Sequence, residues 1–220
     1  MSTPPTLHVR WCRNDQAWPE DRVRAAVERI PPGFRQRLTA YRRWQDRQAG
    51  ILGRRLLDEL HRELLGQDAG PAAPTLDAYR RPYLPAHPDF DFNISHTDGL
   101  VACVAAVGGG RVGVDVERKG AVDITEFRRV FTAREYDRLD ALPDPTDEFY
   151  RLWTRKEAVM KADGRGFYLD AASIDCLSEA VTIGGRAYAV RPLAVPAGFA
   201  AHVAAAGVGE VRVREWRLPG

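Results

Sequence analysis

The sequence has few cysteines and no long apolar run, and both shortages limit what the protein can be. Its three cysteines, Cys12, Cys103 and Cys176, are widely spaced and form no Cys-x-x-Cys pair, which argues against a disulfide framework and against a thiolate zinc site. No segment approaches the roughly 18 consecutive apolar residues that cross a bilayer, and the first thirty residues lack the apolar stretch of a signal peptide. We therefore expect a cytoplasmic protein without a membrane partner.

The chain also lacks a strong net charge. A formal charge of +2 over 220 residues is too small to indicate nucleic-acid binding, so no nucleic-acid partner is expected. With 45% hydrophobic and 28% charged residues, the composition is typical of a soluble globular protein with one large domain or two small ones. Arginines concentrate between residues 31 and 65, where eight stand against four acids. This surplus indicates a basic face offered to an anion.

Residues 111–117, Arg-Val-Gly-Val-Asp-Val-Glu, predict a β-strand with one apolar and one acidic face. Because strand side chains alternate, Val112, Val114 and Val116 point to one side, and Asp115 and Glu117 point to the other. The two carboxylates lie about 7 Å apart by the usual rise per residue, so both can reach one cation, and a divalent metal would relieve their repulsion. The alternative is an edge strand whose acidic face is solvated.

Residues 153–161, Trp-Thr-Arg-Lys-Glu-Ala-Val-Met-Lys, belong to a predicted helix over 149–161. Glu157 and Lys161 are four residues apart and therefore share a face of this helix, one turn beyond Trp153. Taken alone, the pair is typical of an ordinary ion pair that stabilises a helix.

The rest of the chain alternates helical and strand patterns. Further helices are predicted over 21–30, 34–65, 123–130 and 132–142, and strands over 7–11, 90–94, 100–107, 173–177, 181–183, 186–190, 199–205 and 211–216. The glycines at 108–110 predict a hairpin turn that returns the chain into the strand at 111–117. The last five strands predict one antiparallel sheet.

Four segments together resemble the Sfp-type 4′-phosphopantetheinyl transferase family. Residues 113–117, Gly-Val-Asp-Val-Glu, and the Trp-Thr-x-Lys-Glu-Ala-x-x-Lys pattern of residues 153–161 match the two signature motifs of that family in full. Residues 92–97, Phe-Asn-Ile-Ser-His-Thr, are similar to its coenzyme-A-contacting segment. Residues 81–84, Arg-Pro-Tyr-Leu, resemble its Lys-Pro-x-Leu stretch, with arginine in place of lysine.

The resemblance implies a mixed α/β (α+β) fold of two similar subdomains related by a pseudo-twofold axis, each with a small, mainly antiparallel sheet packed on a long helix. Residues 1–109 would form the first subdomain, which carries the coenzyme A face. Residues 110–220 would form the second, which carries the metal and catalytic residues. The active site would lie between the two, and a chain of this length would act as a monomer.

The resemblance also implies a reaction: transfer of the 4′-phosphopantetheine arm of coenzyme A to a serine of an apo acyl or peptidyl carrier protein domain. The products would be the holo carrier protein and adenosine 3′,5′-bisphosphate, in polyketide or nonribosomal peptide biosynthesis. Magnesium would be the cofactor, with manganese as a substitute, because Mg²⁺ prefers oxygen ligands and substrate phosphates.

Each motif position inherits a role from the resemblance. The metal ligands would be Asp115, Glu117 and Glu157, and the catalytic residues Glu157, Lys161 and His96. Whether Glu157 acts as ligand, base or both stays open. The coenzyme A contacts would be Arg37, Arg47, Tyr79, Arg80, Arg81, Pro82, Ser95, His96, Thr97 and Lys161.

Carrier recognition would use residues 124–138, since carrier proteins of this chemistry present an acidic helix beside the serine. This stretch offers four arginines among aromatic side chains, with core packing as the alternative for the aromatics. The arginines are Arg128, Arg129, Arg134 and Arg138.

Two other functions are compatible with parts of the pattern. A magnesium-dependent nucleotide phosphohydrolase would also use carboxylates with lysine and histidine, but it does not require the motif at residues 153–161. A non-catalytic module that binds coenzyme A or a carrier protein is the second alternative. Such a module would be expected to have lost a carboxylate or the helical lysine, and none is missing here.

Overall fold

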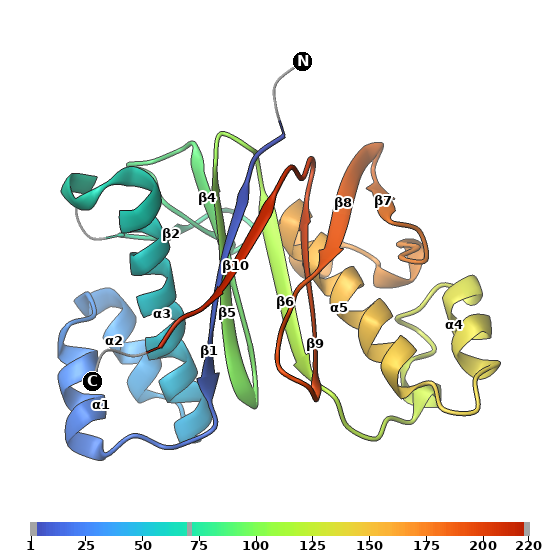
Figure 1. Ribbon diagram of the computed structural model, residues 1–220, viewed down its shortest axis with the longest axis horizontal. Coiled ribbons are helices and arrows are strands. Elements are labelled where there is room, and N and C mark those ends of the chain that lie inside the picture. The colour runs from blue at the N-terminus through green and yellow to red at the C-terminus, as the bar shows by residue number, and fades with distance from the viewer. Residues whose placement is uncertain (1–3, 70–71, 218–220) are drawn as a thin grey trace.

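The computed structural model describes residues 4–69 and 72–217. It has two four-stranded sheets that lie side by side at the centre of the molecule, with helices on both outer sides (Figure 1). The first sheet has the order β10 (Val211–Glu215), β1 (Leu7–Asn14), β5 (Gly99–Val107) and β4 (Phe90–Thr97). The second has the order β6 (Val112–Arg118), β9 (Phe199–Ala205), β8 (Arg186–Pro192) and β7 (Ala180–Ile183).

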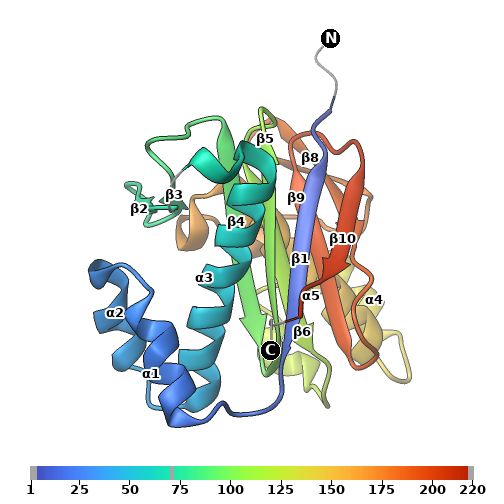
Figure 2. The same cartoon turned by 60° about the vertical axis from the view of Figure 1, so that its left-hand side comes forward.

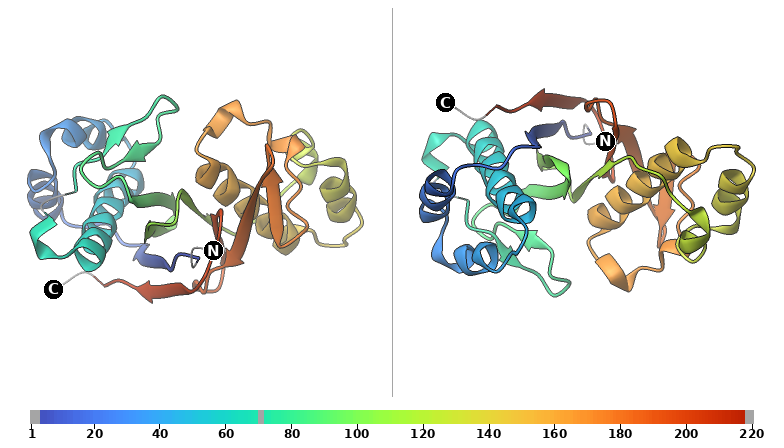
Figure 3. Two further views of the ribbon diagram at one scale, coloured as in Figure 1. Left: turned by 90° about the horizontal axis from the view of Figure 1, so that it is seen from above. Right: turned by 90° about the horizontal axis from the view of Figure 1, so that it is seen from below.

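Each sheet packs on one long helix. The first sheet is covered by α3 (Trp44–Leu65), with α1 (Glu20–Glu28) and α2 (Pro32–Thr39) on the outer side of α3 (Figure 2). The second sheet is covered by α5 (Thr146–Asp163), with α4 (Ala133–Asp140) beyond it. Seen along the strands, α3 and α5 lie on opposite sides of the paired sheets (Figure 3).

Short elements complete the fold. They are the two-stranded hairpin of β2 (Thr75–Leu76) and β3 (Pro82–Tyr83), and the 3-10 turns η1 (Gln67–Ala69), η2 (Ile124–Phe127), η3 (Gly166–Tyr168) and η4 (Ala171–Ser173). Within the described residues, the structure has no helix with the length and apolar content that a bilayer crossing requires. The predicted mixed α/β architecture is confirmed. The pseudo-twofold relation stays a prediction.

Apolar side chains from the inner faces of both sheets form one shared core. Leu7, Val9, Val104, Val114 and Val203 are all fully buried in it. The valines at 112, 114 and 116 therefore occupy the apolar face predicted for them. Their strand lies so close to α5 that a Cβ at Gly113 would come within 2.1 Å of the Ala158 carbonyl oxygen. Glycine at 113 thus allows the acidic face of β6 to meet the helix that carries Glu157 and Lys161.

The seam between the sheets is made by side chains of β4. The predicted hairpin between β5 and β6 is wrong, because the two strands belong to different sheets. The free edge of β6 instead donates its N–H groups to alternate polar side chains of β4, so buried backbone donors keep a partner. The donor–acceptor pairs are Val112 N to Asp91 Oδ2 (2.7 Å), Val114 N to Asn93 Oδ1 (3.0 Å), Val116 N to Ser95 Oγ (3.4 Å) and Arg118 N to Thr97 Oγ1 (3.2 Å).

The predicted helix over 34–65 is wrong as a single helix. It is two helices, because α2 ends at Thr39 and α3 begins at Trp44. The Thr39 hydroxyl donates back to the Gln36 carbonyl (3.0 Å), and Leu38 packs in a small cluster with Val23 of α1. The first segment therefore packs on α1 and the second on the sheet.

The predicted strand over 173–177 is also wrong. Side chains, not a neighbouring strand, satisfy its backbone: Arg155 Nε donates to the Cys176 carbonyl (2.9 Å), Lys156 donates to the Ile174 carbonyl, and Cys176 N donates to Glu135 (2.8 Å). The strand predicted over 211–216 exists as β10, but it pairs in parallel with β1 and not with the second sheet.

A buried ion pair holds α4 against α5. Lys156 Nζ lies 2.8 Å from Glu135 Oε2, and the two side chains are 1% and 0% exposed. Glu135 also completes the capping box of α4 by accepting from Thr132 N (2.8 Å). Lys156, although part of the 153–161 motif, is therefore a structural residue.

We predict that Glu135→Ala destabilises the protein by about 3 to 5 kcal/mol, because it leaves the Lys156 ammonium buried without its partner. Urea denaturation would measure the loss. The exposed Glu126 supplies the control, since Glu126→Ala should change stability by less than about 0.5 kcal/mol. The double variant Glu135→Leu with Lys156→Met should recover much of the loss, and equal stability of the wild type and Glu135→Ala would contradict this assignment.

Candidate active site

A cavity of about 460 Å³ lies where the β4–β6 seam meets α5. Strand β4 contributes Ser95 and His96 to the lining of this cavity. Strand β6 contributes Asp115 and Glu117, and α5 contributes Trp153, Glu157 and Lys161. Six of the residues predicted from the sequence therefore line a single cavity. They are Ser95, His96, Asp115, Glu117, Glu157 and Lys161.

Lys161 lies over the carboxylate of Asp115. Its Nζ donates to Asp115 Oδ1 (2.6 Å) and to Ser95 Oγ (3.0 Å), and the Ser95 hydroxyl donates to the same Asp115 oxygen (3.0 Å). Lys161 of α5 forms its ion pair with Asp115 of β6 rather than with Glu157, which lies one turn earlier on the same helix. Lys161 therefore acts across the seam, and its side chain remains 28% exposed toward the cavity.

The carboxylates of the cavity carry more negative charge than their surroundings offset. Asp115 is 3% exposed, and its Oδ2 is buried without a hydrogen-bond partner. Burial, followed by the charge of Asp115, raises the pKa of Glu117 to about 7, although Thr97 and Trp153 donate hydrogen bonds to it. Burial also raises the pKa of Glu157, which the charge of Lys161 partly offsets. A cation placed among these groups would favour the ionised forms of Glu117 and Glu157.

This donor set suits a hard divalent cation. The available ligand atoms are carboxylate oxygens, which Mg²⁺ and Mn²⁺ prefer. One of them, Asp115 Oδ2, has no hydrogen-bond partner that a metal would have to displace. As placed, however, the described residues contain no group of three or more His, Cys, Asp or Glu side chains that could together hold a metal ion. Lys161 supplies the nearest positive charge to Asp115. The three metal ligands stay a prediction.

A second cavity of about 280 Å³ adjoins the first through His96. It is lined by His96 and Thr97 together with Arg43, which precedes α3 and pairs with Asp98 (2.7 Å). Arg43 was not predicted, because the arginine-rich segment gave no signal that separated it from its neighbours. The structure places it, rather than Arg47, beside the predicted residues.

Of the two arginines that were predicted in the segment of residues 31–65, the structure describes the side chain of Arg47. Arg47 on α3 pairs with Glu20 of α1 (2.9 Å). Arg37 belongs to α2, but its side chain lies outside the described part of the chain. Their roles in binding coenzyme A remain predictions.

The predicted hairpin residues divide into exposed and buried members. Tyr79 is 45% exposed, and its ring centroid lies 5.5 Å from that of Tyr168 in η3. Arg80 adopts a left-handed backbone conformation (φ 64°), and Pro82 begins β3. Arg81 is only 7% exposed, with its guanidinium bonded to protein acceptors.

His202 of β9 is a site neighbour that sequence reasoning missed. It lies directly opposite Asp115 in the β6–β9 ladder and is 6% exposed. Burial lowers the pKa of His202 to about 3, so the ring is neutral, and its Nδ1 lies 2.7 Å from Thr154 Oγ1. Thr154 of the 153–161 motif thus connects α5 to the strand behind Asp115. The signal for His202 was its place in the strand predicted over 199–205, which falls with Asp115 in the subdomain expected over residues 110–220.

The fold and the cavity define a class of protein: an α/β chain of two lobes, each a four-stranded sheet packed on one long helix, with acids, a lysine and a serine–histidine pair gathered where β4, β6 and α5 meet. Comparison with known proteins identifies the family. The model of the 4′-phosphopantetheinyl transferase superfamily matches residues 111–194. This chain belongs to the 4′-phosphopantetheinyl transferase superfamily, and the resemblance to its Sfp-type members is confirmed.

Three relatives illustrate the similarity. A 4′-phosphopantetheinyl transferase of Bacillus subtilis is 34% identical over 154 residues, which are 68% of this chain and 66% of the relative. Sfp of Bacillus subtilis strain 168 is 30% identical over 64% of this chain and 62% of the relative. The human L-aminoadipate-semialdehyde dehydrogenase-phosphopantetheinyl transferase is 31% identical over 74% and 58%. This chain thus spans between 58% and 66% of the length of these relatives, less than two thirds of each.

The raised pKa of Glu117 predicts how stability depends on pH in metal-free protein. In the unfolded chain Glu117 ionises at its usual pKa of 4.5, whereas in the folded protein it stays protonated up to a pH of about 7. The stability that Glu117 contributes at low pH is therefore lost as the pH rises through about 7. Across this range we expect the free energy of unfolding of the wild type to fall by on the order of 1 to 2 kcal/mol relative to Glu117→Gln, after allowance for solvent screening. Urea denaturation with a chelator would measure it, with Glu126→Gln as control. Parallel curves for wild type and Glu117→Gln would refute the assignment.

Proposed function

We propose that this protein transfers the 4′-phosphopantetheine arm of coenzyme A to a serine of an apo acyl or peptidyl carrier domain. The products are the holo carrier and adenosine 3′,5′-bisphosphate, and the pathway is polyketide or nonribosomal peptide biosynthesis. The observation that carries the proposal is the convergence of Ser95, Asp115, Glu117, Glu157 and Lys161 on one cavity. Family membership supports it independently.

In this reaction the carrier serine oxygen attacks the phosphorus that bears the pantetheine arm. The bond from that phosphorus to the bridging pyrophosphate oxygen breaks, and the adenosine bisphosphate leaves with the electron pair. Glu157, whose pKa is raised by burial, takes the serine proton. Lys161 holds its ammonium against the pyrophosphate oxygens, where charge accumulates. A Mg²⁺ ion bound by Asp115, Glu117 and Glu157 would neutralise the remaining charge.

The coenzyme A nucleotide would lie on the first lobe. His96 lines both cavities, so a molecule with its pyrophosphate in the first cavity can extend a further phosphate toward Arg43 and Thr97 in the second. Tyr79 and Arg80 offer an exposed aromatic ring and a cation on the neighbouring hairpin.

The carrier protein would approach over the second lobe. A groove of about 320 Å³ shares Glu117 and Trp153 with the first cavity and is lined by Val122, Phe127 and Tyr150. An acceptor serine in this groove would lie beside Glu117 and Trp153, and Trp153 precedes Glu157 by one turn of α5. Two of the aromatics expected at this surface, Phe131 and Tyr136, are buried in the core, so the groove and the exposed arginines after η2 are the remaining contacts.

A direct assay tests the function: the protein is incubated with coenzyme A, Mg²⁺ and an apo carrier domain, and the carrier is weighed by mass spectrometry. We expect the mass to increase by one phosphopantetheine group. Coenzyme A consumption without an acceptor would instead indicate a phosphohydrolase. Binding of coenzyme A and carrier without a product would indicate a non-catalytic module.

We predict that Lys161→Ala lowers kcat/KM by at least about a hundredfold, equivalent to roughly 3 to 4 kcal/mol of lost transition-state stabilisation. Lys119 provides the matched control, because it is a surface lysine paired with Asp147 (2.7 Å) away from the cavity. Lys119→Ala should keep its activity. A loss of less than tenfold in Lys161→Ala would mean that Lys161 only stabilises the seam.

We also predict that exposed arginines after η2 attract the carrier. Arg134 and Arg138 are paired with Asp175 and Glu148, whereas Arg128 and Arg129 are exposed next to Phe127 of the groove. Charge reversal of Arg128 and Arg129 to Glu should raise the KM for an acidic carrier about tenfold at low salt, because electrostatic attraction is lost, while the KM for coenzyme A stays constant. Arg212→Glu on β10 is the control. An unchanged carrier KM would exclude this surface.

A further inference from the structure

Two arginines from outside α5 hold its last turn. A helix ends with carbonyl groups that have no partner within the helix, and positive charge is favourable there. Arg81, from the β2–β3 hairpin, donates to the carbonyl of Lys161, and Arg111 Nη1 donates to the carbonyl of Asp163 (2.9 Å). Arg111 in turn pairs with Asp77 of the hairpin loop (3.2 Å). The C-terminal turn of α5 is therefore attached to the first lobe.

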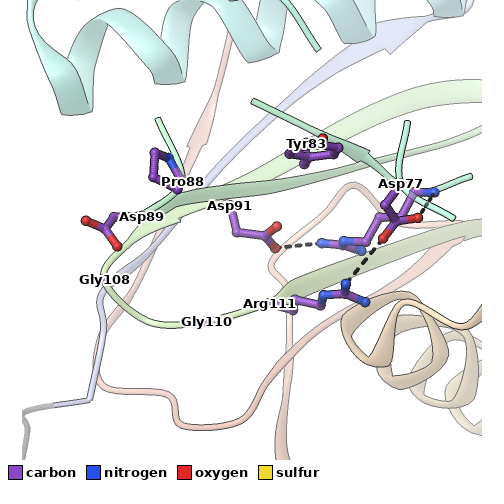
Figure 4. Close-up of a pocket in the computed structure, with 9 residues that line it drawn as sticks. Asp77, Tyr83, Pro88, Asp89, Asp91, Gly108, Gly110 and Arg111 are labelled. Atoms are coloured by element: carbon purple, nitrogen blue, oxygen red, sulfur yellow. Dashed lines mark hydrogen bonds and ion pairs between the residues drawn. The ribbon is translucent and has the colours of Figure 1, made fainter. Parts of the chain in front are cut away.

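Arg81 is the centre of this attachment. Its Nη2 donates to Asp91 Oδ2 of β4 (2.6 Å), to the Phe92 carbonyl (3.2 Å) and to the Val112 carbonyl of β6 (2.8 Å). Asp91 Oδ2 also accepts from Val112 N (2.7 Å), the first hydrogen bond of the β4–β6 seam. Figure 4 shows Asp91 and the Asp77–Arg111 pair beside a cavity of about 430 Å³, which Arg81 also lines. One guanidinium thus connects the hairpin, β4, β6 and α5.

Arg81 bonds to Lys161, whose side chain reaches into the active-site cavity. Arg81 fixes the backbone carbonyl of Lys161, while Lys161 Nζ extends to Asp115 Oδ1 (2.6 Å) and Ser95 Oγ (3.0 Å). Those two partners lie further along the same strands, β6 and β4, that Arg81 joins. Since misplacement by about 1 Å can lower a rate about a hundredfold, the position of this turn determines whether Lys161 faces the reacting phosphate.

We propose that Arg81 and Asp91 form a positioning pair that fixes the last turn of α5, so that Lys161 Nζ stays aligned with Asp115 and Ser95. Arg81 then acts through Lys161 and does not bind a phosphate of coenzyme A, because both of its terminal nitrogens are already bonded to protein acceptors. This inference rests on the proposed function only for the role of Lys161. The attachment itself can be tested without substrate.

The first test is amide hydrogen exchange of the free protein. Asp91→Asn weakens the pair, and we expect exchange at residues 161–164 to become at least tenfold faster, including the Gly164 amide that donates to the Met160 carbonyl (3.0 Å). Exchange in the first half of α5 should not change. Glu210→Gln is the matched control, because Glu210 forms an exposed pair with Arg212 (2.7 Å). Unchanged exchange at 161–164 in Asp91→Asn would overturn the proposal.

The second test separates positioning from ligand binding by kinetics. Asp91→Asn should lower kcat at least tenfold while the KM for coenzyme A stays within threefold. Arg81→Lys should behave in the same way, because an ammonium retains the charge but not the planar fork that bonds several acceptors. Adding Asp91→Asn to Arg81→Lys should cause little further loss, as expected for one coupled unit.

Two results would overturn the proposal. A raised KM for coenzyme A with normal kcat in Arg81→Lys would identify Arg81 as a direct coenzyme A ligand. Full activity of that variant together with unchanged hydrogen exchange would show that Arg81 does not hold the last turn of α5. If the wild type transfers no phosphopantetheine, the proposed function fails, and the exchange experiment still decides whether Arg81 and Asp91 hold the helix.

Discussion

The unpaired edge of β6 is the constraint on which the site depends. A strand edge exposes N–H groups that need acceptors once they are buried. Here every second residue of β4 supplies one from its side chain, so the two sheets meet without joining into a single ladder. Because these bonds use side chains, the seam leaves room for Asp115 and Glu117 to face a cavity. Ser95 and Thr97 serve both the seam and the cavity.

The charges in the cavity follow from this arrangement. Asp115 comes to lie between a serine from the other sheet and a lysine from the helix, and Glu117 lies beside Thr97 and Trp153. Burial makes Glu117 hard to ionise unless positive charge is added to the cavity. An anionic substrate alone would increase the excess of negative charge in the cavity, whereas a substrate that binds together with a divalent cation would reduce it. Under the proposed function, nucleotide and metal would therefore bind together.

The sequence predicted the features that depend on local pattern. Alternation placed the valines of 112–116 in the core and the acids opposite them, and the boundaries of β9 were predicted to the residue. The helix predicted over 132–142 is present as α4, with Thr132 as its N-cap. The errors fall where tertiary contacts replace local pairing: residues 173–177 have strand character, yet Arg155, Lys156 and Glu135 take up their backbone groups. Strand pairing, such as that of β10, is set by contacts across the whole chain, which a periodic pattern does not encode.

The pairing of β10 with β1 has a consequence for how the protein is made. Leu7 is aligned with Val211, so the first sheet takes its edge strand from a segment that follows all of the second sheet in the sequence. Contacts between residues so far apart in sequence form late, because a long loop must close first. On the ribosome, residues 7–107 would emerge with the outer edge of β1 unpaired until residues 211–215 had been synthesised. The last strand therefore completes the first lobe, and the folding of the two lobes is coupled in time as well as in space.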